Sequence, residues 1–386
     1  MKISRCIAQS IKDSGAEIVS CVPGFGGTEV FDSWIELNDG KPVYSFHEEV
    51  AFAVAHGAAI AGSRSVLLTK AHGLAKAANA AVDALYAGLN AGMLIMVFHD
   101  EDGRHSDNIF DIEPFIKGLR YPLIEPDTTN IEASISQAFV QSEELQLPII
   151  LLLNSKIVNE EKEYQLIPHG FIKSHFSRDV HKNLVVPIFA KYQFDVVNAK
   201  LQNRNWENIE KPGIPKLPDG LPPNYAAIVK GYMPLFDVLK TLRGDIVFGD
   251  TGVSTLFALP PYDCVDACAY MGGSIPMAIG AYLAGYKNTW AITGDFSFIA
   301  AGQLGLIEAR QREIPLKVII FNNQKAQTTG GQNIRSGTLQ LVLEGYKDSV
   351  LEIDDPSNRE QTEKVLSMVA RSKKLQIVVA NYIEGE

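Results

Sequence analysis

Short apolar runs alternate with longer stretches in which apolar residues recur at helical spacing, from residue 3 to residue 153. The short runs predict strands at 16–22, 42–46, 65–69, 93–98 and 148–153. The longer stretches predict helices at 3–14, from about 28, at 50–61, from 70 to about 89, and at 130–144. Such alternation is typical of a parallel sheet that is covered by helices on both faces.

The same alternation returns in the last part of the chain, after a stretch without a clear pattern. Five prolines crowd into that stretch and exclude a regular helix there: Pro212, Pro215, Pro218, Pro222 and Pro223. Beyond it, we predict strands at 246–249, 289–293, 318–321 and 375–380, and helices at 233–242, 274–284, 304–312 and 360–369. A chain of 386 residues is long enough for two domains. We therefore predict two α/β domains with parallel sheets, at 1–156 and 226–386, joined by a linker at 157–225.

Two strand ends in the second domain carry side chains that suit an anion and a cation. Gly294 and Asp295 follow the strand at 289–293, and Asn322 and Asn323 end the next strand, so both segments should lie at the same edge of the sheet. A glycine and a carboxylate that face a helix N-terminus suit phosphate oxygens and a hard cation. From these residues alone, an acidic turn followed by an asparagine-rich turn is an equal alternative, because short motifs also match by chance.

Candidate acid–base groups lie at the predicted carboxyl ends of the first domain's strands. Glu48 opens a helix, where the helix dipole alone would also favour a carboxylate. Histidine is the usual side chain for proton transfer at physiological pH, so His72 and His105 are candidates for moving protons on a substrate, although a surface or helix-capping role fits them as well. Arg104 lies in the long polar loop at 99–108 and is either a ligand for a substrate carboxylate or a solvated loop residue.

Charge and cysteine content narrow the classes of function. Lys and Arg number 35 and Asp and Glu 45, so the net charge is −10, and no basic run is present to neutralise a nucleic-acid backbone. We therefore expect no nucleic-acid partner. The N-terminus lacks the apolar core of a signal peptide, and no stretch reaches the roughly 18 apolar residues of a spanning helix, so we expect a cytoplasmic protein without a membrane segment. The cysteines form no CxxC pair and are expected to be buried, reduced thiols: Cys6, Cys21, Cys264 and Cys268.

The pair Gly294-Asp295 and Asn322-Asn323 resembles the cofactor motif of thiamine diphosphate enzymes, with Phe296 where most members carry a second glycine. The resemblance implies thiamine diphosphate and Mg²⁺ as cofactors. It implies Asp295, Asn323 and the main-chain carbonyl of Lys325 as magnesium ligands. It also places further residues beside the cofactor: Gly252, Gly294, Phe296 and Ser297.

Two other segments resemble the same family. The segment 47–51 matches the one that holds the glutamate protonating N1′ of the aminopyrimidine ring, which implies that role for Glu48. The segment 272–275 matches the one whose carbonyl contacts the 4′-amino group, at Gly273, and whose bulky residue, Ile275, bends the cofactor. Core packing is also compatible with Ile275.

Within that superfamily the chain most resembles the alpha subunit of indolepyruvate ferredoxin oxidoreductase, through segments such as 103–106, 249–252 and 266–272. The resemblance implies a pyrimidine-binding and a diphosphate-binding domain without a middle domain, in a homodimer or a dimer of dimers. Two features depart from it. The cysteines of the iron–sulfur domain have no counterpart in this sequence. Where the relatives have a lysine followed by a histidine, this chain has Lys70 followed by Ala71, and a histidine, His72, comes one position later.

The leading hypothesis is therefore non-oxidative decarboxylation of a 2-oxo acid, with an aromatic substrate as the expectation from the resemblance. Protonation after loss of CO2 releases an aldehyde, whereas addition to a second carbonyl compound, a carboligation, gives an acyloin. One alternative is the thiamine subunit of a 2-oxo acid:ferredoxin oxidoreductase whose electron-transfer subunit is a separate chain. A further alternative is a non-catalytic relative that retains the fold.

Overall fold

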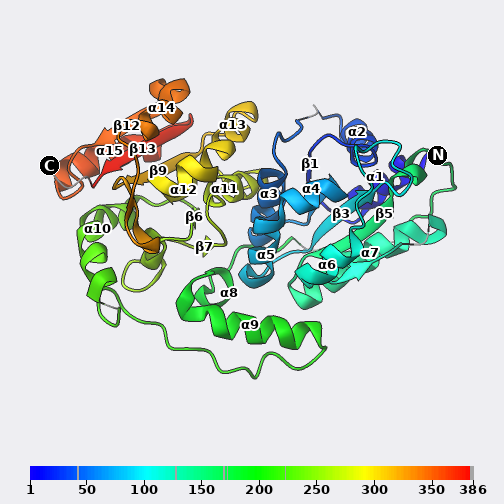
Figure 1. The fold of residues 1–386 in the computed structure, drawn as a ribbon, viewed down its shortest axis with the longest axis horizontal. Helices are drawn as coiled ribbons and strands as arrows, with labels where there is room; N and C mark the ends of the chain where they lie inside the picture. Colours follow the sequence, from blue (N-terminus) through cyan, green and yellow to red (C-terminus); the bar gives the residue numbers. More distant parts are fainter. Residues whose placement is uncertain (41–42, 127, 168–169, 172, 222, 383–386) are drawn as a thin grey trace. The chain divides into compact units, whose positions relative to one another are not determined.

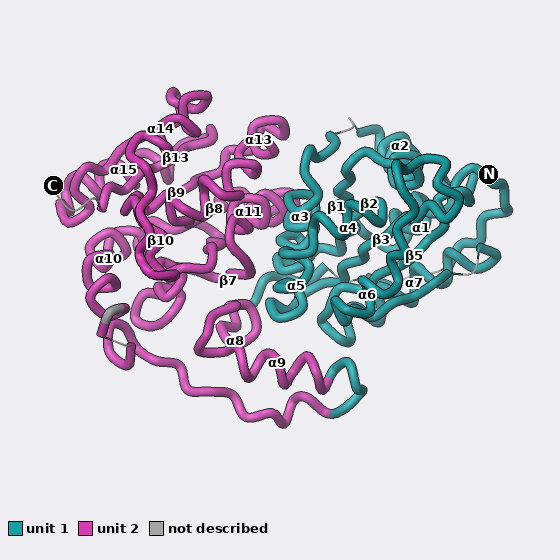
Figure 2. The backbone as a smooth tube through the Cα atoms, in the orientation of Figure 1, with its two compact units in different colours: residues 1–177, 200–204 teal, residues 178–199, 205–386 magenta. Residues whose placement is uncertain are grey.

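The computed structural model describes residues 1–40, 43–126, 128–167, 170–171, 173–221 and 223–382. The chain divides into two compact units (Figure 2). Unit 1 comprises residues 1–177 and 200–204, and unit 2 comprises residues 178–199 and 205–386.

Unit 1 is built on a five-stranded parallel sheet in the order β1-β2-β3-β5-β4. Figure 1 labels β1, β3 and β5 of this sheet. Its strands are β1 Ile18–Cys21, β2 Ser65–Lys70, β3 Met93–His99, β4 Leu123–Ile124 and β5 Ile149–Asn154. Its helices are α1 Ile3–Asp13, α2 Gly27–Leu37, α3 Glu48–Ile60, α4 Ala71–Lys76, α5 Ala78–Ala87, α6 Glu113–Leu119 and α7 Ile131–Leu145. The predicted alternation of strands and helices is confirmed in this unit.

Helices cover both faces of this sheet. On one face, apolar residues of α1, α2 and α7 form a core with alternate residues of the strands, among them Val66, Leu68 and Leu94. On the other face, the hydroxyls of Ser20 and Ser65 donate to main-chain carbonyls of α3 at 2.8 and 2.7 Å. A sheet that is buried on both faces needs apolar residues at nearly every strand position, which is why the strands read as continuous apolar runs.

The strand predicted at 42–46 is wrong over the described residues 43–46, and Pro42 lies outside them. Ser45 donates its N–H to the Cys21 carbonyl at 2.9 Å, next to the end of β1. Tyr44 instead turns toward α2, where its ring meets Phe31 edge-on and its hydroxyl bonds Asp32. Packing against α2 thus replaces strand pairing in this segment. The helix predicted from 70 to about 89 is divided at Ala77 into α4 and α5, and α6 and β4 were not predicted.

A histidine in the middle of α3 makes the stability of unit 1 depend on pH. His56 is fully buried, and neither of its ring nitrogens has a hydrogen-bond partner among the described residues. Burial lowers the pKa of this imidazole from 6.5 to about 3. The unfolded chain therefore binds the proton more tightly than the folded one. The stability that depends on neutral His56 is fully present above pH 6.5 and is lost as the pH falls toward 3.

We expect the free energy of unfolding to fall by about 1.4 kcal/mol per pH unit below the unfolded pKa because of this one group. In His56→Leu that contribution is absent, so between pH 6.5 and 4.5 the wild-type protein should lose about 2 to 3 kcal/mol more than the variant. Urea unfolding at several pH values measures the difference. Parallel stability curves for the two proteins would contradict this account.

Unit 2 contains a six-stranded parallel sheet in the order β12-β13-β9-β8-β6-β7 and a short hairpin of β10 and β11. The strands are β6 Ile246–Gly249, β7 Ala267–Cys268, β8 Thr289–Gly294, β9 Lys317–Asn322, β10 Lys325–Ala326, β11 Gln332–Asn333, β12 Val350–Ile353 and β13 Gln376–Asn381. The helices are α8 Val180–Asn183, α9 Pro187–Leu201, α10 Pro223–Leu242, α11 Ser274–Leu283, α12 Asp295–Ser297, α13 Gln303–Gln311, α14 Thr338–Leu343 and α15 Arg359–Arg371. The predicted parallel-sheet α/β class is confirmed for both units.

The core of unit 2 lies between its sheet and helices α10 and α15. Phe236 of α10 stacks on Phe257 with ring centroids 3.7 Å apart and also meets Phe321 of β9. Helices α11 and α13 pack against each other, and α11 lies against β6 and β8. The four cysteines of the chain are buried and form no disulfide, as predicted.

The segment predicted as a linker at 157–225 is only partly irregular. It contains α8 and α9, and apolar residues in and between these helices, including Leu184 and Phe189, join the core of unit 2. Helix α10 already begins at Pro223, because proline is tolerated in the first turn of a helix. Pro212, Pro215 and Pro218 lie in irregular backbone, as predicted.

Among the described residues, no helix combines the length and the apolar character that crossing a bilayer requires.

Candidate functional site

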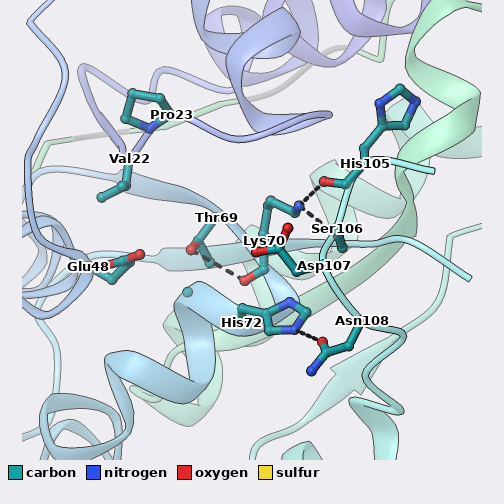
Figure 3. Close-up of a pocket in the computed structure, with 11 residues that line it drawn as sticks. Val22, Pro23, Glu48, Thr69, Lys70, His72, His105, Ser106, Asp107 and Asn108 are labelled. Atoms are coloured by element: carbon teal, nitrogen blue, oxygen red, sulfur yellow. Dashed lines mark hydrogen bonds between the residues drawn. The ribbon is translucent and has the colours of Figure 1, made fainter. Parts of the chain in front are cut away.

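Unit 1 brings together three residues that the sequence analysis identified separately. Glu48, His72 and His105 line one pocket of about 350 Å³ (Figure 3). Strand β2 ends at this pocket with Lys70, and the loop after β3 contributes its far wall with residues 105–108. The pocket therefore lies at the carboxyl ends of parallel strands, where ligands of such sheets bind.

Glu48 is the first residue of α3, and its side chain is mostly buried, with 18% of its surface exposed. Its carboxylate pairs with Lys76 of α4 at 2.8 Å between Oε2 and Nζ. A cofactor nitrogen that bonds Glu48 would share this carboxylate with Lys76.

His72 directs its ring into the same pocket. Its Nε2 lies within hydrogen-bonding distance of Asn108 Oδ1. Because that partner is a carbonyl oxygen, Nε2 carries the proton and donates it. His72 is thus held between α4 and the 105–108 segment, and its role in proton transfer stays a prediction.

His105 enters the pocket through its backbone. The imidazole points away from Lys70 and His72 (Figure 3). It stacks on Phe25 with ring centroids 3.8 Å apart. The His105 N–H donates to Asp100 at 2.7 Å, and its carbonyl faces Lys70. The geometry gives His105 a part in shaping the loop, and an acid–base role for its ring stays a prediction.

Arg104, the other polar candidate of this loop, is 78% exposed and lies 3.9 Å from Asp102. It is not among the residues that line the pocket. Lys70 is the lysine that does line it. In the sequence it stands out only as the lysine of the relatives' lysine–histidine pair, whose histidine is replaced by Ala71.

Unit 2 brings seven of the predicted residues together around a second pocket, of about 190 Å³. They are Gly252, Gly294, Asp295, Phe296, Ser297, Asn323 and Lys325. Strands β8 and β9 are neighbours, and Gly294 pairs with Phe321. The two motif segments therefore meet at one sheet edge, as predicted.

Asp295 is the buried carboxylate of this pocket, with 2% of its surface exposed. It starts α12, directly after β8. Its Oδ2 accepts the Gln324 N–H at 2.6 Å, and its Oδ1 accepts the Phe296 N–H at 2.8 Å. Burial raises the pKa of this carboxyl to about 6, although these N–H donors act in the opposite direction.

Asn323 follows β9 and is held by two other residues. Its Oδ1 accepts the Lys325 N–H at 3.0 Å, and its Nδ2 donates to the Tyr232 hydroxyl at 3.2 Å. These contacts fix which end of the amide carries oxygen. A carbonyl oxygen has a second lone pair, so Oδ1 retains the capacity to bind a cation.

The segment with Gly273 and Ile275 lies beside the helix that follows Asp295. Between α12 and α13 that helix contains a π turn at Phe298–Gly302, and a Cβ at Gly272 would lie 2.5 Å from Ala301 Cβ. The Gly273 carbonyl accepts the Met277 N–H at 3.0 Å in the first turn of α11. Ile275 is fully buried, so core packing accounts for its position. Neither Gly273 nor Ile275 lines the pocket, and their contacts with a cofactor stay predictions.

Asp250 is a buried group that the sequence analysis did not select. It is 1% exposed, its Oδ1 accepts the Ser274 N–H at 2.8 Å, and its Oδ2 accepts the Thr293 hydroxyl. It therefore connects the start of α11 with the end of β8. Its position directly after the apolar strand β6 is the sequence feature that could have identified it as a site residue.

Comparison with known families defines the class of unit 2. Residues 250–358 match the family model described as thiamine pyrophosphate enzyme, C-terminal TPP binding domain. This range includes every predicted site residue of unit 2. This match, which lies within unit 2, confirms the resemblance of the sequence to thiamine diphosphate enzymes.

The chain is similar in sequence to indolepyruvate oxidoreductase subunits. It is 26% identical to subunit IorA of Archaeoglobus fulgidus over 52% of this chain and 34% of that protein. It is 20% identical to subunit IorA of Methanothermobacter thermautotrophicus over 96% of this chain and 84% of that protein. The first of these matches thus spans about a third of its relative's length.

The fold is shared with a solved thiamine diphosphate-dependent 4-hydroxybenzoylformate decarboxylase from Rhodococcus jostii RHA1. The TM-score is 0.65 at 13% sequence identity, with 100% of both chains covered. At that identity the likeness establishes a common fold.

Proposed function

We propose that this thiamine diphosphate-dependent enzyme decarboxylates a 2-oxo acid without oxidation. The observation that carries the proposal is the pair Asp295 and Asn323 at neighbouring strand ends, inside the residues that match the TPP-binding domain. A buried carboxylate and an amide oxygen are the hard oxygen donors that Mg²⁺ takes in sites shared with phosphates.

The donor set fits magnesium. Burial raises the pKa of Asp295 to about 6, and main-chain N–H groups, of Phe296 and Gln324, are the donors that its carboxylate bonds. A divalent cation would offset this cost of burying the ionised form. We propose that Asp295, Asn323 and the main-chain carbonyl of Lys325 would hold this cation, whose charge would offset that of the diphosphate.

The same pocket has room for a diphosphate. A Cβ added at Gly252 or at Gly294 would meet no atom within 4 Å, so both glycines border open space. Phe296 and Ser297 lie in the first turn of the helical run that starts at Asp295, where backbone N–H groups suit anionic oxygens. We propose these four residues as cofactor contacts, together with Gly273 and Ile275.

Unit 1 supplies the ionisable side chains of the reaction. We propose that Glu48 holds the proton exchanged with N1′ of the cofactor ring, and that His72 and His105 handle protons on the substrate side. Bound thiamine diphosphate supplies the group that accepts the electron pair released when CO2 leaves.

The four cysteines favour the non-oxidative course. All are buried, and within the described part of the chain no cluster of three or more His, Cys, Asp or Glu is arranged to bind a metal ion. We propose that the electron pair passes to a proton, which releases an aldehyde, or to a second carbonyl compound. The R. jostii relative is named for 4-hydroxybenzoylformate, an aromatic 2-oxo acid, and we propose that class of substrate here.

The similarity to IorA supports a second candidate. Those relatives are named as oxidoreductase subunits. In this alternative the chain is the thiamine subunit, and an iron–sulfur protein on a separate chain takes the electrons.

For the assembly we propose a homodimer or a dimer of dimers, in which Glu48 of one chain serves a cofactor bound by unit 2 of another. The support is the resemblance of both segments to a family that builds its sites from two chains, and dimers with twofold symmetry are the commonest assembly.

The deciding experiment supplies Mg²⁺, thiamine diphosphate and phenylglyoxylate to the purified protein. We expect CO2 together with benzaldehyde or benzoin, and loss of both on removing Mg²⁺ with EDTA. CO2 release that requires oxidised methyl viologen would favour the oxidoreductase alternative. Absence of thiamine diphosphate binding in calorimetry would support the non-catalytic alternative.

A further inference from the structure

The ammonium group of Lys70 is held in place at the pocket of unit 1. Its Nζ donates to the His105 carbonyl at 2.6 Å and to the Ser106 hydroxyl at 2.7 Å (Figure 3). Its aliphatic part passes over Gly24, where an added Cβ would lie 2.7 Å from Lys70 Cγ. Packing against Gly24 thus fixes the aliphatic part of the Lys70 side chain, and two hydrogen bonds fix its ammonium group.

The charge of Lys70 has no counterion in the described part of the chain. Both oxygens that it bonds are neutral, and no carboxylate of the described residues lies within 4.0 Å of its Nζ. The acidic residues that line the pocket are Glu48, which pairs with Lys76, and Asp107. A lysine ammonium has three N–H donors, so one remains for a ligand.

We propose that Lys70 binds the carboxylate of the 2-oxo acid substrate and thereby selects for acids over neutral carbonyl compounds. The inference rests on the proposed function and assigns the substrate subsite within it. A charge-assisted hydrogen bond from an ammonium is among the stronger polar contacts in proteins. Arg104 is less suited to this role because it is 78% exposed and outside the pocket.

The reaction determines which kinetic constant Lys70 influences. The bond between the carboxylate carbon and the neighbouring carbon breaks, CO2 leaves without charge, and the electron pair left behind, which bound thiamine diphosphate would accept, is finally taken up by a proton or a second carbonyl carbon. The negative charge next to Lys70 is therefore lost in the step. Lys70 stabilises the bound acid at least as strongly as the transition state, so it lowers KM without raising kcat.

The test compares Lys70→Gln with the wild-type holoenzyme on two substrates. For phenylglyoxylate we expect KM to rise about 10- to 100-fold, because the variant loses one hydrogen bond between charged groups. We expect kcat to be unchanged or higher. For carboligation of benzaldehyde, which has no carboxylate, we expect KM to stay within about twofold. Lys70→Arg, which keeps the charge, should recover most of the affinity for the acid, and Lys117→Gln, an exposed lysine of α6, is the matched control.

An unchanged KM for phenylglyoxylate would overturn the proposal, and so would equal losses for the acid and the aldehyde, which would make Lys70 a structural clamp of the loop. If the wild-type protein shows no turnover, the proposed function fails separately. In that case calorimetric binding of phenylglyoxylate to the protein with Mg²⁺ and thiamine diphosphate decides the role of Lys70. Weaker binding to Lys70→Gln supports the carboxylate site, whereas equal binding to both proteins, or to neither, overturns it.

Discussion

Glu48→Gln is expected to lower kcat about a thousandfold while thiamine diphosphate binding changes little. An amide cannot exchange a proton with the cofactor ring, and loss of a positioned acid–base group costs about two to four orders of magnitude. The variant keeps the size of the side chain at the start of α3, and the pocket walls at β2 and at 105–108 do not depend on its charge. Steady-state decarboxylation measures kcat, and calorimetry measures cofactor affinity.

The matched control is Glu49→Gln. Glu49 is the next carboxylate of the same helical turn, and its Oε1 accepts a hydrogen bond from Asn79 at 2.7 Å. It does not line the pocket, so its variant should retain kcat within about twofold. Full activity of Glu48→Gln would contradict the mechanism, and equal losses in both variants would indicate damage to α3.

Asp295→Asn is expected to abolish magnesium-dependent binding of thiamine diphosphate and, with it, decarboxylation. Loss of an outer-sphere group costs about 10- to 100-fold in metal affinity, so loss of a charged ligand should cost more. The substitution also places an amide N–H₂ where Oδ2 accepts the Gln324 N–H, which disturbs the turn that presents Asn323. Calorimetric titration with thiamine diphosphate at fixed Mg²⁺ measures the loss.

The control for this substitution is Asp237→Asn, an exposed carboxylate of α10 that pairs with Lys240 at 3.3 Å. It should bind the cofactor as the wild-type protein does. Retained magnesium-dependent binding in Asp295→Asn would remove this residue from the ligand set.

Mixing the Glu48→Gln and Asp295→Asn proteins tests the proposed assembly. If each site uses two chains, random exchange of subunits leaves about a quarter of all sites free of both substitutions, and activity returns in the mixture.

Most elements of the fold could be predicted from periodicity because both sheets are parallel and buried on both faces. Strands such as β5 and β9 are apolar at nearly every position and stand out from amphipathic helices such as α7. Short elements carry too few residues for a period, so β4 and β7 were not predicted. The segment 43–46 has strand-like composition, but the contacts of Tyr44 with α2 decide its path.

The candidate sites were likewise only partly predictable from the sequence. The motif at 294–323 could be placed at one sheet edge from its two strands, and the pairing of β8 with β9 confirms this placement. The orientation of His105 could not be predicted, since its ring stacks on Phe25, eighty residues earlier in the chain. The same holds for Asp250, whose partners Ser274 and Thr293 come from two other elements.

The sequence by itself determined the alternation of strands and helices, the parallel-sheet class and the cofactor motif, because each depends on neighbours along the chain. The tertiary structure alone decided which polar groups face a pocket. Among the described residues Lys70 has no counterion, and the loop after β3 brings two neutral oxygens to its ammonium group. Asp295 is buried at the end of β8, where the turn after β9 supplies the Gln324 N–H to its carboxylate. Such burial and pairing depend on residues distant in sequence, so no local pattern encodes them.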